Sequence, residues 1–152
     1  PAGRVLCLRQ RWRGYRGRLG GGGVPFEPGR VAELGVGARR GRGRVAQVLA
    51  AKDRPTGFVT SNEVATIGAI SATGALSPKE VKAIGFVSRD GTNMFDYFDI
   101  PVSSCYFSLL DAGEILASWL VKAVEGAPVE TLQDVERTQF ISRPYKTFGE
   151  TI

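Results

Sequence analysis

The chain has 152 residues, of which 43% are hydrophobic, and a formal net charge of +5. This length and composition predict one folded domain, or a large part of one, and exclude general disorder. The absence of histidine removes the commonest general base and the commonest metal ligand, and no apolar stretch is long enough to span a bilayer. We therefore expect neither a metal site, a cofactor nor a membrane partner.

Positive charge is concentrated at the start of the chain. Residues 1–54 carry 13 Lys or Arg against 3 Asp or Glu, whereas residues 55–152 carry 7 against 12. The start lacks the apolar core of a signal peptide, so a cytoplasmic location is expected, and the missing initiator methionine indicates a fragment of a longer protein. Cys7 and Cys105 have no metal-binding or CxxC spacing and are predicted to be buried thiols, with a redox or disulfide role as the alternative.

The first 54 residues predict little regular structure. Residues 4–8 form a short apolar run typical of a strand, and residues 9–19 alternate arginine with glycine and aromatics. The second segment fits either a nucleic-acid-binding tail or an irregular helix whose Trp12, Tyr15 and Leu19 share one face. Residues 37–43 are a Gly/Arg cluster, and residues 45–52 follow as a helix; we expect this first third to be the least ordered part of the chain.

The stretch from Arg54 to Ala69 predicts a strand, a polar turn and a helix. Residues 57–60 suit a short buried strand, Ser61 or Asn62 can cap the next helix, and the apolar residues that follow have helical spacing. In an α/β sheet such a turn lies at the carboxyl end of a strand, where small ligands bind.

The remaining segments repeat this alternation. Residues 74–80 predict a turn, 81–87 a second buried strand parallel to the first, and 88–101 a polar loop that is a candidate for ligand contact. Residues 102–106 predict a third strand, Ser108 caps a helix that runs to about Glu125, and residues 136–141 form a last strand before a tail.

With these elements in place, the chain resembles the lac-repressor/galactose-repressor (LacI/GalR) family of bacterial transcription regulators. The likeness is carried by RPTGFVTSNEVATIGA at residues 54–69, VKAIGF at 81–86, DAGEILA at 111–117, EGAP at 125–128 and Ser142-Arg143. Earlier in the chain, RWRGY at residues 11–15 is similar to the family's R-x-x-G-[FY] pattern.

The resemblance implies an α/β fold of the periplasmic-binding-protein-like type, with a parallel sheet flanked by helices and an effector between two lobes. The chain would supply only the latter part. Residues 1–101 and 130–143 would belong mostly to one lobe, and residues 102–126 would be a returning strand and helix of the other. No counterpart of the family's DNA-binding domain is present, so operator DNA would be bound by a part of the parent protein outside these residues.

The resemblance also implies ligand-binding residues. Arg11 matches the family arginine that binds ligand hydroxyls or carboxylates, and Asn62 matches the asparagine that binds a hydroxyl; their alternatives are a solvated arginine and a helix cap. The family's aspartate after G-F is Val87 here, so Ser88, Arg89 and Asp90 would supply the polar contacts. This change favours a sugar acid or another anionic molecule over a simple neutral sugar.

We therefore expect the ligand-sensing and dimerisation module of an allosteric LacI-type regulator, which binds a sugar or sugar-like effector and is not an enzyme. Ile67, Ile70 and the apolar cluster at residues 94–98 are candidate homodimer contacts, with a core role as the alternative. A periplasmic solute-binding protein of a sugar transporter is the alternative function, and an Arg/Gly-mediated RNA-binding protein is a more remote one.

Overall fold

The computed structural model describes residues 6–31, 38–135 and 137–145. The α-helices are α1 (Leu6–Gly21), α2 (Ala38–Leu49), α3 (Glu63–Ala72), α4 (Pro78–Lys82) and α5 (Leu109–Val124). The strands are β1 (Gly57–Val59), β2 (Gly85–Asp90), β3 (Val102–Tyr106) and β4 (Gln139–Ile141). Short 3-10 turns, at Pro28–Arg30, Thr73–Ala75, Met94–Tyr97 and Val129–Thr131, complete the described elements.

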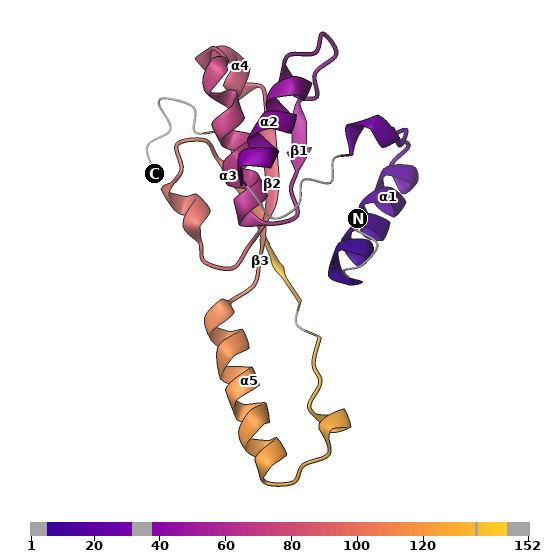
Figure 1. Cartoon of the computed structure of the whole chain (residues 1–152), viewed down its shortest axis with the longest axis vertical. Coiled ribbons are helices and arrows are strands. Elements are labelled where there is room, and N and C mark those ends of the chain that lie inside the picture. The colour runs from indigo at the N-terminus through magenta and orange to yellow at the C-terminus, as the bar shows by residue number, and fades with distance from the viewer. Residues whose placement is uncertain (1–5, 32–37, 136, 146–152) are drawn as a thin grey trace.

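The strands form one sheet in the order β1-β2-β3-β4. β1, β2 and β3 are parallel, and β4 runs antiparallel to β3 (Figure 1). Phe58 lies opposite Phe86 in this register, and Ser88 lies opposite Ser104. The α/β class and the parallel arrangement of the first strands, both predicted from the sequence, are confirmed.

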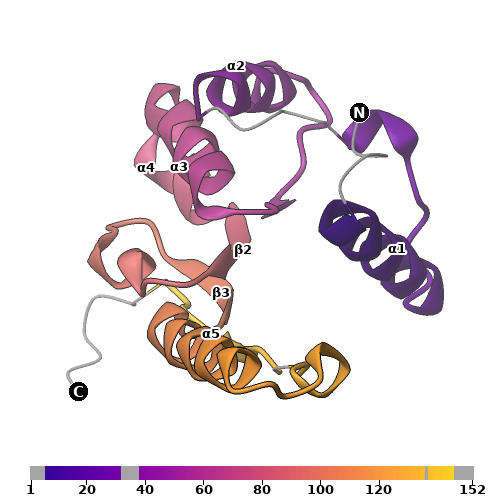
Figure 2. The same ribbon diagram turned by 60° about the horizontal axis from the view of Figure 1, so that its bottom comes forward.

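The hydrophobic core lies between this sheet and the α2–α3 pair. Helices α2 and α3 pack side by side on one side of the sheet, where glycines at their crossing allow close approach (Figure 2). The buried apolar side chains come from both helices, β2, β3 and the connections just before and after β2: Val45, Leu49, Ala69, Ala72, Ile84, Phe86, Phe95 and Val102. This packing fixes the start of α3 relative to the ends of β1 and β2.

Helices α1 and α5 lie outside this core. Both views show α1 beyond the β1 edge and α5 extending away from the far side of β3. Apolar residues repeat along one face of α5, but Leu116, Leu120 and Val124 are all exposed. None of the helices in the described part of the chain is both long and apolar enough to cross a membrane.

Several predicted segments differ from the structure. The prediction of a strand at residues 4–8 is wrong for the described residues 6–8, because these belong to α1. A short apolar run by itself does not distinguish a strand from a helix. Residues 78–82 form α4 instead of part of a turn and strand, because Ser77 and Glu80 make a reciprocal capping box with Pro78 in the first turn.

β2 consequently starts at Gly85 and continues to Asp90, so its last three residues replace the start of the predicted loop. The last strand is shorter than expected, at Gln139–Ile141. β3, predicted as the returning strand of the other lobe, lies between β2 and β4 in the same sheet, and the division into lobes stays a prediction. Cys105 is a free, half-buried thiol, whereas the side chain of Cys7 lies outside the described residues.

Candidate functional site

The turn after β1 is held against the end of β2. The backbone N–H of Thr60 donates to the carbonyl oxygen of Val87 at 2.9 Å, and its hydroxyl lies 3.2 Å from the same oxygen. Ser61 and Asn62 follow directly. The parallel pairing therefore brings the two predicted corners, the β1–α3 turn and the end of β2, to the same edge of the sheet.

A chain of three hydroxyls, two of them buried, connects these corners beneath α3. The Thr66 hydroxyl oxygen lies 2.6 Å from that of Thr60 and 2.6 Å from that of Ser88. Thr66 and Ser88 are both buried, and Thr66 also bonds to the carbonyl oxygen of Asn62 at 2.9 Å. The side chain of Ser88, a predicted ligand contact, thus lies under α3 and fixes the helix to the strand.

Asn62 is the N-cap of α3. Its Oδ1 accepts a hydrogen bond of 2.8 Å from the backbone N–H of Ala65, which satisfies one of the free donors at the start of the helix. Its Nδ2 lies 3.4 Å from the Ser61 hydroxyl. The cap role is confirmed. The side-chain amide donors lie at the sheet edge where a ligand contact was predicted, and that contact stays a prediction.

Helix α1 brings Arg11 to the same edge, next to the β1–α3 turn. Its Nη1 donates to the carbonyl oxygen of Ser61 at 2.9 Å, so α1 contacts the β1–α3 turn next to Asn62. The Arg11 side chain remains exposed. Residues 50 positions apart in sequence, Arg11 and Ser61, are therefore joined at the predicted site.

Arg89 lies near the other end of the edge, on the last part of β2. Its guanidinium carbon is 3.6 Å from the centroid of the Phe107 ring, a cation–π contact that orients the half-buried side chain. Gly91 permits this close approach, because a Cβ at Gly91 would lie 2.9 Å from Leu109 and 3.2 Å from Phe107.

Asp90 is completely buried at the end of β2. One carboxylate oxygen accepts from the backbone N–H of Thr92 at 3.1 Å, and the other lies 3.8 Å from Nη2 of Arg143. The neighbouring Gly91 N–H donates to Glu63 at 2.7 Å, which connects the first turn of α3 to the strand end. Asp90 therefore supports this corner from inside.

Arg143 organises the side of the sheet next to this corner. Its guanidinium donates to the carbonyl oxygen of Val102 at 3.0 Å and to the Ser104 hydroxyl at 2.8 Å, and it forms a 2.6 Å ion pair with Asp96. Only 13% of the Arg143 side chain is exposed. Sequence reasoning included Arg143 in the resemblance but missed this role, because its partners are 39 to 53 residues away in sequence and meet it only through the β3–β4 pairing.

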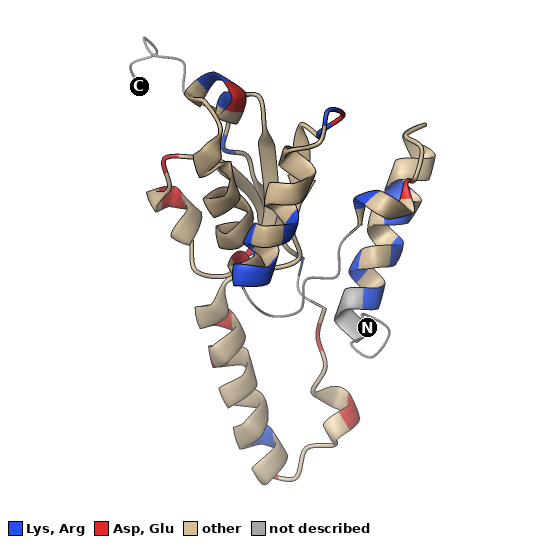
Figure 3. Ribbon diagram, turned by 45° about the horizontal axis from the view of Figure 1, so that its top comes forward, with Lys and Arg blue, Asp and Glu red and all other residues tan. Residues whose placement is uncertain are grey.

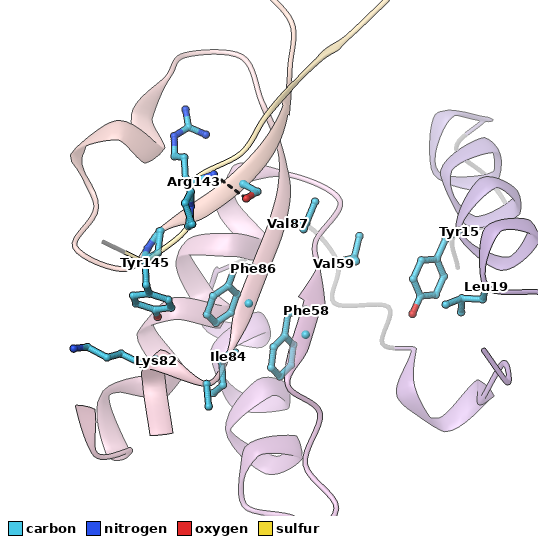
Figure 4. A pocket seen from close by; sticks show the side chains of 16 residues that line it. Tyr15, Leu19, Phe58, Val59, Lys82, Ile84, Phe86, Val87, Arg143 and Tyr145 are labelled. Carbon is cyan, nitrogen blue, oxygen red and sulfur yellow. Dashed lines mark hydrogen bonds between the residues drawn. The ribbon is translucent and has the colours of Figure 1, made fainter. Parts of the chain in front are cut away.

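A cavity of about 510 Å³ lies apart from this edge, between α1 and the sheet (Figure 4). Tyr15 and Leu19 line it from the α1 side, and Phe58, Val59 and Val87 line it from the sheet. It contains none of the five predicted ligand-binding residues. Tyr145 also borders it; this hydroxyl donates to the carbonyl oxygen of Val81 at 3.0 Å, and burial raises the pKa of Tyr145. Within the described ranges, Cys, Asp and Glu side chains do not gather into a group that could hold a metal ion.

The sheet order, the flanking helices and the polar strand ends define an α/β domain of the periplasmic-binding-protein-like type. Among solved structures, a regulatory protein of the LacI family from Chloroflexus aggregans is 25% identical, with a TM-score of 0.74 over 90% of this chain and 50% of its own. The chain therefore has the fold of half of a LacI-family effector domain, which confirms the resemblance and the fold predicted from the sequence.

Two further solved structures have the same fold. The transcription regulator CcpA of Lactococcus lactis is 22% identical, with a TM-score of 0.76 over 91% of this chain and 51% of its own. A LacI family transcriptional regulator from Arthrobacter, solved in complex with lactose, is 17% identical, with a TM-score of 0.70 over 87% of this chain and 49% of its own. The chain thus spans about half the length of each of these structures. No protein-family model matches it, and no curated protein does.

Proposed function

We propose that the chain is the ligand-sensing part of a cytoplasmic LacI-type transcription regulator, and that it acts by binding and not by catalysis. The observation that carries the proposal is the meeting of Arg11, Asn62 and the β2 end at one sheet edge, in a chain whose fold matches regulators over about 90% of its length. In open α/β folds this edge is where ligands bind. A sugar or sugar acid fits the side chains there.

Three side chains make the direct contacts in this proposal. Arg11 and Arg89 supply guanidinium forks for a carboxylate or paired hydroxyls, and the Asn62 amide donates to a hydroxyl. Ser88 and Asp90 act from beneath, because both are buried and already contact protein groups. The lactose complex of the Arthrobacter regulator supports a sugar-like ligand, and the two arginines favour one that carries negative charge.

The apolar face of α5 fits a second lobe that the longer protein would supply. Leu109, Leu116 and Leu120 repeat along this helix and are exposed in this chain. Because each is already partly covered, burying the rest of each side chain would contribute about 1 to 2 kcal/mol. We therefore assign α5, but not β3, to the other lobe, so that a ligand in the cleft biases the relative orientation of the lobes and, by linkage, operator binding through a separate DNA-binding domain.

A homodimer completes the proposal. Of the candidate interface residues, Phe95 is 1% exposed and belongs to the core. Ile67 and Tyr97 are exposed, as is Val64 on the same helix as Ile67. These three side chains are available to pack against a second copy.

A thermal-shift screen tests the ligand site directly. Lactose, gluconate and glucose 6-phosphate are added to the chain, because a compound that binds only the folded form raises its melting temperature. We expect a rise with at least one of the acidic probes. If neither this chain nor the longer parent with both lobes showed a rise with any of these probes, the proposal would be wrong.

Asn62→Asp separates binding from folding. Aspartate caps helices as well as asparagine does, so the melting temperature without ligand should stay within the error of the wild type. The variant loses the amide donor and adds a negative charge, so the rise caused by an acidic probe should disappear. An unchanged rise would exclude Asn62 from the site.

A further inference from the structure

Helix α1 carries an unbalanced positive charge. Its 16 residues include five arginines and no acidic residue, and α2 adds four more arginines, again without an acidic residue. Figure 3 shows Lys and Arg banding α1 and the first half of α2. All nine side chains are exposed: Arg9, Arg11, Arg13, Arg16, Arg18, Arg39, Arg40, Arg42 and Arg44.

Among the described residues, the acidic side chains near these helices do not neutralise this charge. Glu27 and Asp53 both pair with Arg30, at 2.6 and 3.5 Å. The hydrogen bond to Glu27 raises the pKa of Arg30, as expected for a committed pair. Across the part of the chain that the structure describes, no arginine of α1 or α2 forms an ion pair with a carboxylate. The positive charge of the α1 arginines is therefore available to attract an external anion.

Three of the α1 arginines form a row. Arg9, Arg13 and Arg16 are spaced i, i+4, i+7, which places them on one side of the helix. At 1.5 Å per residue the row is about 10 Å long, whereas the two steps that join three successive phosphates of one strand rise about 7 Å along the duplex axis, a difference that long, exposed arginine side chains can bridge. Their planar guanidinium groups match phosphate oxygens in pairs.

The aromatic rings of α1 are already engaged within the protein. Trp12 stacks with Tyr15, with ring centroids 6.1 Å apart, and makes an edge contact with Phe26 at 5.1 Å. Proteins that bind single strands use open rings on which bases stack. The occupied rings favour a partner recognised through its backbone, and a duplex has the higher density of phosphate.

We propose that the Arg9–Arg13–Arg16 row of α1 binds the phosphate backbone of double-stranded DNA without reading its sequence. This contact is independent of the effector site, since Arg11, the α1 residue at that site, lies outside the row. In a DNA-binding parent it would add nonspecific affinity beside the base-reading domain.

The test is fluorescence anisotropy of the 152-residue chain with a labelled 30-base-pair duplex of random sequence. Binding should weaken with salt with a log–log slope near −2.7 for three phosphate contacts, which is about a 40-fold loss between 50 and 200 mM salt. The double variant Arg9→Gln/Arg13→Gln should reduce the slope by about 1.8, because two contacts are lost.

A matched variant separates the row from net charge alone. Lys79→Gln/Lys122→Gln removes the same charge from two exposed residues elsewhere and should leave the slope unchanged. Equal effects of the two double variants would overturn the proposal, and so would an unchanged slope in the arginine variant with helix content intact by circular dichroism. Tighter binding of a single-stranded oligonucleotide of equal length would show that the partner is not a duplex.

Discussion

Gly68 is the position at which the structure reverses the ordinary effect of a substitution. It lies inside α3, where replacing glycine by alanine normally stabilises a helix by about 1 kcal/mol. Here a Cβ would overlap the carbonyl oxygen of Ala38 and lie 3.1 Å from the backbone nitrogen of Arg42, both on α2. Backbone atoms of a packed helix cannot rotate away, so α2 and α3 must separate.

The magnitude follows from these two opposing effects. Overpacking a core costs about 1 to 3 kcal/mol, and a clash with two backbone atoms belongs at the upper end of that range. After the gain in helix propensity, Gly68→Ala should lower the free energy of unfolding by about 2 kcal/mol. The separation also displaces Asn62 at the start of α3, so the variant should weaken ligand binding.

Urea unfolding followed by circular dichroism measures this change, and Gly43→Ala is the control. Gly43 lies in α2 with no atom within 4 Å of a Cβ, so that variant should gain about 1 kcal/mol. The two midpoints should therefore move in opposite directions at an unchanged m-value. If Gly68→Ala were as stable as Gly43→Ala, the close α2–α3 crossing would be refuted.

Three further variants test other parts of the fold. The pKa of Glu80 is lowered from 4.5 to about 2, chiefly by the hydrogen bond from the Ser77 hydroxyl. The ionised Glu80 carboxylate therefore adds stability that is present above pH 4.5 and is lost as the pH falls toward 2. Glu80→Gln should flatten that part of a plot of unfolding free energy against pH. Arg143→Met leaves the buried Asp90 without its cation and should cost about 3 to 5 kcal/mol in urea unfolding; a loss below 1 kcal/mol would contradict the ion pair. Leu120→Gln should change the stability of this chain by less than about 0.5 kcal/mol, because the side chain is exposed, whereas a loss above 2 kcal/mol would show that α5 is already packed.

Much of the sheet could be predicted from the sequence because its signals are local. Residues 57–59 and 102–106 are short apolar or alternating runs beside turn residues, and Asn62 and Ser108 are cap residues directly before helical spacing. The prediction of a turn and strand around residues 78–82 was wrong for an equally local reason, because the Ser77–Glu80 capping box that starts α4 was not recognised.

The candidate site was predicted only in part. The sequence placed Asn62 and the β2 end at one edge, because parallel strands share their carboxyl ends, and the structure has them there. It could not indicate that Ser88 and Asp90 point into the protein. That depends on which side of β2 is covered by α3, and a strand alone does not specify its covered face when both faces carry apolar residues.

The sequence by itself determined the fold class, the parallel strands and the excess of positive charge in the first third, because each depends on residue type and spacing along the chain. Only the tertiary structure decided that Arg11 reaches Ser61, that Arg143 joins β3 to the β2 end, and that α5 remains uncovered. The two arginine contacts depend on how segments 39 to 53 residues apart in sequence come together. The exposure of α5 depends on which other elements of the chain pack against it. Local spacing carries no record of such distances.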